Sequence, residues 1–228
     1  VLEDNFVAGR PEWEVAGVQM VEDVLPWEQM KLRMLNGSHS FLAYLGYLAG
    51  YAHINECMQD DSFREAARRL MLNEQAPTLR ITNVDLTAYA DSLLDRFANP
   101  ALQHRTWQIA MDGSQKLPQR MLDGIRMHLE RNTAWPLLAL GVAGWMRYVS
   151  GTDEQGNAID VRDPLSDKFQ AIVATSSDAE RVSALLTLNE IFGDDLPQNP
   201  VFVEAITSAY QRLVRLGARQ AVIETLKI

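Results

Sequence analysis

The sequence is poor in cysteine and in basic residues, and it has no long apolar run. Cys57 is the one cysteine among 228 residues, which excludes an internal disulfide and a zinc site built from cysteines. A lone thiol is typical of a reducing compartment, and we expect a cytoplasmic protein. The most apolar stretch, residues 41–54, is shorter than the about 20 residues that a membrane-spanning helix needs. We interpret it as a buried core helix.

The shortage of basic residues also excludes two classes of partner. The chain has 30 acidic and 21 basic side chains, a formal net charge of -9 and an isoelectric point near 4.9. Such a surface repels phosphate backbones and anionic lipid headgroups, so we expect neither nucleic acid nor a membrane as a partner. The hydrophobic fraction of 47% in a chain of this length is enough for a core of its own.

The first residues predict a junction rather than the start of a protein. The chain begins Val-Leu-Glu-Asp-Asn-Phe without an initiator methionine, and no secretory signal follows. We expect a fragment of a longer protein that begins near the end of a strand. Residues 17–24 alternate imperfectly between apolar and polar and are flanked by glycine and proline, which predicts a short strand. We assign residues 1–25 to a junction segment.

From Pro26 onward, apolar residues recur at spacings of three and four through most of the chain. The predicted fold is therefore mainly α, with a multi-helix domain over residues 26–228 after the short strand segment. The expected helices cover residues 26–36, 38–54, 61–74, 84–98, 104–112, 115–131, 134–149, 164–174, 178–192 and 199–226.

Local signals fix several boundaries of these helices. Asn199 before Pro200 predicts an N-cap, as does Ser177 or Asp178 for the preceding helix. Gly217 is expected to interrupt the last helix. The polar residues between 150 and 164 predict an exposed loop that divides two helical groups rather than two domains.

Two segments, residues 41–51 and 135–149, are apolar on nearly every side. A helix of this kind is buried on all sides, so both should lie in the middle of the bundle. Gly46 and Gly50 stand four residues apart in the first of them. We interpret the pair as a site of close helix packing inside the core.

Three polar residues of different chemistry, Lys31, Asn36 and His39, interrupt an otherwise apolar helical stretch. In one continuous α-helix Asn36 and His39 share a face, whereas Lys31 lies about 140° away from Asn36. Bringing all three together needs a break, and Gly37 is the residue expected to provide it.

Such a trio suits the reversible oxidation of a secondary alcohol. A base removes the hydroxyl proton while hydride leaves carbon, and hydrogen-bond donors hold the oxygen as its charge develops. Lys31 can act as this base if partial burial among Met30, Leu32 and Leu35 lowers its pKa. On spacing alone, the simpler alternative is a solvated lysine, a helix-breaking Asn-Gly pair and a core histidine.

The segment Lys-Leu-Arg-Met-Leu-Asn-Gly-Ser-His at residues 31–39, followed by Leu-Gly-Tyr-Leu-Ala-Gly at 45–50, closely resembles the signature of the mannitol dehydrogenase family of polyol and sugar-acid dehydrogenases. Further segments resemble the same family in the same order, and together they cover essentially the whole chain. These are residues 3–11, 17–19, 112–116 and 151–164.

The resemblance implies roles for particular residues. Lys31 is the general base, Asn36 helps to polarise the reacting oxygen, and His39 orients it through a hydrogen bond. Glu28 matches a position that connects the lysine to solvent for proton release. An ordinary first-turn acid that is favoured by the helix dipole is an equal alternative for Glu28.

The substrate and cofactor sites are implied in the same way. Lys116 matches a substrate-contacting lysine, with a solvated lysine at the start of a helix as the alternative. Gln108 is a weaker candidate in the same region. Family members carry a nucleotide-binding Rossmann domain ahead of this region, and it binds most of the NAD or NADP. No Gly-x-Gly-x-x-Gly follows a predicted strand here, so the cofactor-binding residues are unknown.

The expected function is that of the C-terminal substrate and catalytic domain of a metal-independent NAD(P)-linked oxidoreductase. The sequence resembles the branch that interconverts D-mannonate and D-fructuronate, with mannitol or another polyol as the alternative substrate. The expected partners are this small molecule and the protein's own N-terminal domain, without which the chain should be inactive. No histidine has ligands at metal-binding spacing, so no metal is expected. The alternative from another class is a non-catalytic helical interaction module.

Overall fold

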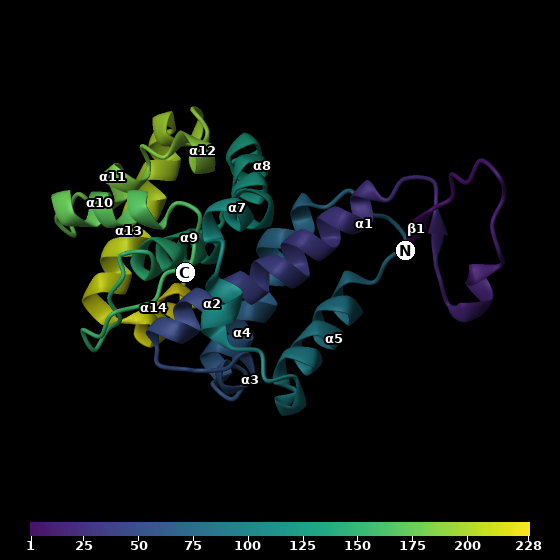
Figure 1. Cartoon of the computed structure of the whole chain (residues 1–228), viewed down its shortest axis with the longest axis horizontal. Coiled ribbons are helices and arrows are strands. Elements are labelled where there is room, and N and C mark those ends of the chain that lie inside the picture. Colours follow the sequence, from purple (N-terminus) through teal and green to yellow (C-terminus); the bar gives the residue numbers. More distant parts are fainter.

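The first 24 residues form an arm that projects from the helical body of the chain (Figure 1). The computed structural model describes residues 1–228. Within the arm, strand β1 (Leu2–Glu3) pairs in parallel with β2 (Met20–Val21), and the short 3-10 helix η1 (Trp13–Ala16) lies between them. The predicted strand is confirmed, although it is only two residues long.

One continuous helix follows the arm and contains the three residues that the sequence singled out. It consists of α1 (Leu25–Met30), the π-helical segment η2 (Lys31–Gly37) and α2 (Ser38–Leu48). The expected break at Gly37 is wrong, because this residue has helical angles, φ -65° and ψ -49°. The glycine is needed for space, since a Cβ atom there would lie 2.8 Å from both the Arg120 carbonyl oxygen and Gln75 Nε2.

Helix α2 packs against α9 (Pro136–Tyr148), which packs in turn against α13 (Pro200–Leu216). Nearly every residue of α2 and α9 is buried, which confirms that these two helices form the middle of the bundle. The close-packing prediction holds for Gly46, where a Cβ atom would lie 2.4 Å from Cys57 Sγ. It is wrong for Gly50, which adopts φ +90° in open space and belongs to the turn after α2.

The remaining helices surround this core (Figure 1). They are α3 (Ile54–Cys57), α4 (Asp61–Arg69), η3 (Leu70–Gln75), η4 (Ala76–Thr78), α5 (Leu86–Ala98), η5 (Pro100–Leu102), α6 (Thr106–Ala110), α7 (Gly113–Leu117), η6 (Pro118–Leu122), α8 (Asp123–Arg131), α10 (Ser166–Thr175), α11 (Arg181–Leu185), α12 (Asn189–Phe192), η7 (Leu196–Gln198) and α14 (Ala218–Thr225). The fold is mainly α, as predicted. No helix has both the length and the apolar character that crossing a bilayer requires.

The expected boundaries hold where a local signal is strong. Asn199 Oδ1 accepts hydrogen bonds from the amides of Val201 and Phe202 at 3.0 and 3.1 Å, which confirms the N-cap of α13. Gly217, at φ +75°, separates α13 from α14. The cap expected at Ser177 or Asp178 is wrong: α11 begins only at Arg181, and the Ser177 hydroxyl donates to Glu180 instead.

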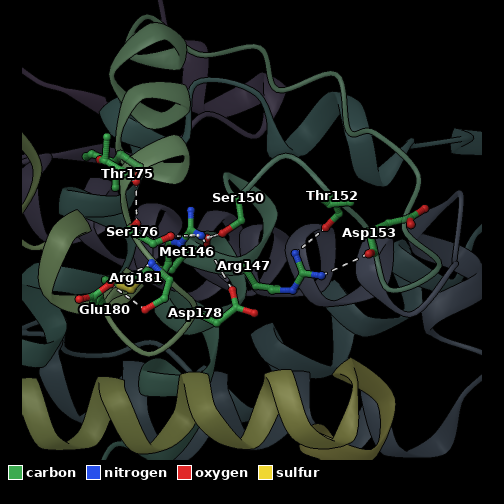
Figure 2. Close-up of polar contacts among 12 residues, drawn as sticks. Met146, Arg147, Ser150, Thr152, Asp153, Thr175, Ser176, Asp178, Glu180 and Arg181 are labelled. Atoms are coloured by element: carbon green, nitrogen blue, oxygen red, sulfur yellow. Dashed lines mark hydrogen bonds and ion pairs between the residues drawn. The ribbon is translucent and has the colours of Figure 1, made fainter.

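Two arginines fix backbone segments near the ends of α9 and α10, and one of them contacts the predicted loop at residues 150–164 (Figure 2). Arg147 donates to the carbonyl oxygens of Thr152 and Asp153 and so holds the exposed loop against the end of α9. Arg181 is buried and donates to the carbonyl oxygen of Ser176 at 3.0 Å. The prediction of an exposed loop between two helical groups is confirmed.

Candidate active site

A π-helical turn brings the three candidate residues to one side of a helix. In a π-helix the backbone hydrogen bonds join residues i and i+5, so two residues five apart lie about one turn apart on the same side. In an α-helix two residues five apart point in different directions. Lys31 and Asn36 are five residues apart and both belong to η2. His39 follows Asn36 by three residues in the first turn of α2. The added residue of the π turn therefore aligns the trio without any break in the helix.

Lys31 lies at the edge of an apolar groove. The groove has a volume of about 530 Å³ and borders the arm; it is lined by Val1, Val24, Trp27, Glu28, Met30, Lys31, Leu35 and Tyr89. The partial burial expected for Lys31 is not found, because its side chain is exposed in this chain. Met30 is only 6% exposed and packs into the core, while Leu35 forms part of the groove wall. Glu28 is also exposed and lines the same groove.

His39 lies between aromatic and cationic side chains. Its ring stacks on Phe97, with centroids 4.8 Å apart, and lies 5.3 Å from the ring of His104. Burial, reinforced by His104, Arg120, Arg96 and Lys116, lowers the pKa of His39 to about 3. The imidazole is therefore neutral at any ordinary pH, and its buried Nε2 has no hydrogen-bond partner within the chain.

Asn36 and Arg120 meet on the same side of the helix. The Asn36 side chain is half-buried and makes no hydrogen bond within the chain, so its amide is available to a ligand. Arg120 Nη1 donates to Ser40 Oγ at 2.9 Å and to the Asn36 carbonyl oxygen at 3.5 Å. Burial lowers the pKa of the Arg120 guanidinium.

Lys116 lies close enough to His39 for its charge to affect the imidazole. Its Nζ donates to the Met111 carbonyl oxygen at 2.5 Å and lies 3.9 Å from the Asp112 carboxylate. Burial, followed by repulsion from Arg120, lowers the pKa of Lys116. Gln108 lies on α6 with an exposed side chain that hydrogen-bonds to none of the other candidates.

Sequence reasoning missed four residues that border His39: Arg96, Phe97, His104 and Arg120. These residues come from α5, the loop before α6, and η6, between 57 and 81 positions along the chain from His39. No local pattern predicts such a contact. Only Arg120 could have been suggested from the sequence. It follows Lys116 by four residues, and residues at this spacing lie on the same face of a helix.

The arrangement has the chemistry of a site for an oxygenated anionic molecule. A neutral imidazole and a free amide can hold an oxygen atom, and the cationic side chains nearby can bind a carboxylate. Lys31 stands one turn away from Asn36, where an amine can exchange a proton with that oxygen. No group of three or more His, Cys, Asp or Glu side chains is arranged to hold a metal ion.

Comparison with known proteins places this chain in one family. A family profile described as "Mannitol dehydrogenase C-terminal domain" matches residues 23–214. The chain belongs to the mannitol dehydrogenase family.

Its relatives include two Escherichia coli proteins. The chain is 75% identical over its whole length to the uncharacterized oxidoreductase YeiQ, and 62% identical over 97% of its length to D-mannonate oxidoreductase. Among solved structures, Pseudomonas fluorescens mannitol 2-dehydrogenase, in a ternary complex with NAD and D-mannitol, aligns with 99% of the chain at 38% identity and a TM-score of 0.90. The chain spans 46–47% of the length of these proteins.

Proposed function

We propose that the chain is the substrate-binding and catalytic domain of an NAD(P)-dependent oxidoreductase that interconverts a sugar acid and its keto form, D-mannonate and D-fructuronate. The observation that carries the proposal is the π turn, which aligns Lys31 and Asn36 next to a neutral His39. The 62% identity to D-mannonate oxidoreductase supports the same activity.

In this mechanism Lys31 is the general base. Its neutral amine takes the proton from the substrate hydroxyl during oxidation, and the ammonium returns it to the carbonyl oxygen during reduction. Asn36 and His39 donate hydrogen bonds to the same oxygen and hold it as its charge changes. Since burial keeps His39 neutral, the imidazole has one N–H to donate and does not compete with Lys31 for the proton. Glu28, which lines the same groove, relays the proton between Lys31 and solvent.

The groove beside Lys31 fits the reactive end of a nicotinamide cofactor. Trp27, Leu35 and Tyr89 give it apolar walls that suit a planar ring, while this chain has no glycine-rich loop for the phosphates. A nicotinamide bound in this groove would supply the hydride chemistry, while residues of this chain would hold the substrate oxygen and move its proton. We propose that a nucleotide-binding domain, joined through residues 1–25, covers the groove. Its closure would give Lys31 the burial that a lysine base needs.

The charges around His39 support a sugar acid. Arg96, Lys116 and Arg120 give this side of the site a positive potential that complements a carboxylate. Lys116 has a second and a third N–H to offer besides the one that it donates to Met111. Gln108 remains a weaker candidate for a substrate contact, because no observed contact brings it toward His39.

A substrate comparison with the complete two-domain enzyme tests this proposal. Initial rates with fructuronate, fructose, mannonate and mannitol, each with NAD(H) and NADP(H), should give the highest kcat/KM for the uronate pair. A preference for fructose and mannitol would instead indicate a mannitol 2-dehydrogenase, as in the solved structural relative. Absence of turnover with every compound would favour a non-catalytic helical module.

A further inference from the structure

Three π-helical turns meet next to the proposed active site. They are η2, η3 and η6; η2 and η6 lie within longer helices, and η3 follows α4 at the end of its helix. Segment η2 packs against both of the others. A π turn is rare and interrupts the regular hydrogen bonding of an α-helix, so three of them in mutual contact need a local cause.

Gln75 and Arg120 join the three turns at one point. Gln75 ends η3, is fully buried, and donates from Nε2 to the Arg120 carbonyl oxygen at 2.9 Å. Gly37, the last residue of η2, packs on these same two groups, and a Cβ atom there would lie 2.8 Å from each. The contact therefore fixes the backbone of η2 directly after Asn36.

The Arg120 side chain contacts the helix formed by η2 and α2 at two residues, one before and one after His39. Its Nη1 donates to Ser40 Oγ at 2.9 Å and, more weakly, to the Asn36 carbonyl oxygen at 3.5 Å. Its Nε is buried and has no partner. A buried donor without a partner costs free energy, so the fold must stabilise the Arg120 side chain elsewhere, and the hydrogen bond from Gln75 to the Arg120 carbonyl oxygen fixes the backbone that carries it.

We propose that Arg120 is a positioning residue of the active site, which with Gln75 holds the π turn of η2 in the register that aligns Lys31 and Asn36. The inference rests on the proposed function of the site. Arg120 acts through Asn36 and His39 and does not touch the substrate.

A second effect of Arg120 is on the charge of His39. The groups that face the imidazole are Arg96 from α5, His104 from the loop before α6, Lys116 from α7, and Arg120. None of these is an acid. Removing the Arg120 charge weakens the repulsion that opposes a proton on His39, so the imidazole should gain a proton at a higher pH.

The test compares Arg120→Met and Arg120→Lys in the complete enzyme. We expect Arg120→Met to lower kcat by up to about 100-fold with a much smaller change in KM, because misplaced groups slow the reaction more than they weaken binding. Arg120→Lys keeps the charge but loses the planar guanidinium whose Nη1 contacts both Ser40 and the Asn36 carbonyl oxygen, so it should recover only part of kcat. If Arg120→Met does not fold, Gln75→Met replaces it in the test, because it removes the hydrogen bond to the Arg120 carbonyl oxygen.

A matched control and a second measurement separate positioning from folding. Arg126→Met removes a half-buried arginine of α8 that pairs with Asp195, away from the site, and should leave kcat unchanged. In the 228-residue chain, NMR titration of His39 should show protonation at a higher pH in Arg120→Met and near-wild-type behaviour in Arg120→Lys.

A folded Arg120→Met enzyme with kcat within about twofold of wild type would overturn the inference, whatever its melting temperature. If the complete protein oxidises or reduces none of the tested substrates, the proposed function fails, and the NMR titration alone decides. A shift in the His39 titration then supports the role of Arg120, and an unchanged titration overturns it.

Discussion

The ring of His39 lies flat on the ring of Phe97, with centroids 4.8 Å apart and planes within 9°. This burial lowers the pKa of His39 from its usual 6.5 to about 3. The unfolded chain therefore binds a proton at this site between these values while the folded chain does not. We predict that His39 makes the free energy of unfolding fall as the pH drops from 6.5 toward 3, by at most about 1.4 kcal/mol per pH unit.

Urea denaturation of the 228-residue chain and of its His39→Gln variant across this pH range checks the prediction. Glu74 contributes with the opposite sign: burial raises its pKa from 4.5 to about 7, so its contribution falls as the pH rises between these values. The contribution of Glu74 is the same in wild type and variant, so it cancels when their free energies of unfolding are subtracted. Parallel stability curves for wild type and variant would show that His39 is not held neutral by the fold.

Glu74 is also the N-terminal anchor of the central helix α9. Its carboxylate is 4% exposed and accepts hydrogen bonds from the amides of Leu137 and Leu138 at 2.8 and 2.7 Å. Glu74→Ala should lower the free energy of unfolding by about 1–3 kcal/mol, because two buried amides lose their acceptor. Glu74→Gln keeps one acceptor oxygen and should lose less. Equal losses for the two variants in chemical denaturation would contradict the capping role.

The 228-residue chain should not bind NADH measurably in calorimetry. A helical domain without a glycine-rich loop presents no set of backbone amides to a pyrophosphate, and the groove proposed for the nicotinamide would contact only that end of the cofactor. The complete enzyme should bind it. Micromolar affinity of the isolated chain would contradict the assignment of the cofactor site to a preceding domain.

Lys116→Ala tests the preference for a sugar acid. In the complete enzyme we expect the variant to lose more kcat/KM for fructuronate than for fructose, by about 1.5–3 kcal/mol, which is typical of a hydrogen bond to a charged group. The measurement is the ratio of the two kcat/KM values in wild type and variant. An unchanged ratio would mean that Lys116 does not bind the carboxylate.

The sequence predicted the helical fold because apolar spacing and end signals such as Asn199 act locally. It also singled out Lys31, Asn36 and His39 as one site, but it expected a helix break at Gly37 where the structure has a continuous helix with a π turn. A π turn leaves no clear mark in the sequence, since Gly37 is required by its contact with Arg120 and Gln75 rather than by its own backbone angles. The surroundings of His39 were beyond prediction, because they come from segments far along the chain.

Lys31 is the proposed general base of the reaction. Its side chain is exposed and makes no hydrogen bond within the chain, so Lys31→Met should leave the melting temperature of the 228-residue chain almost unchanged. The most direct measurement is kcat of the complete Lys31→Met enzyme at its optimal pH. We predict a decrease of ~10²–10⁴-fold, as expected for loss of a general base. A kcat within a few-fold of wild type would mean that Lys31 is not the base.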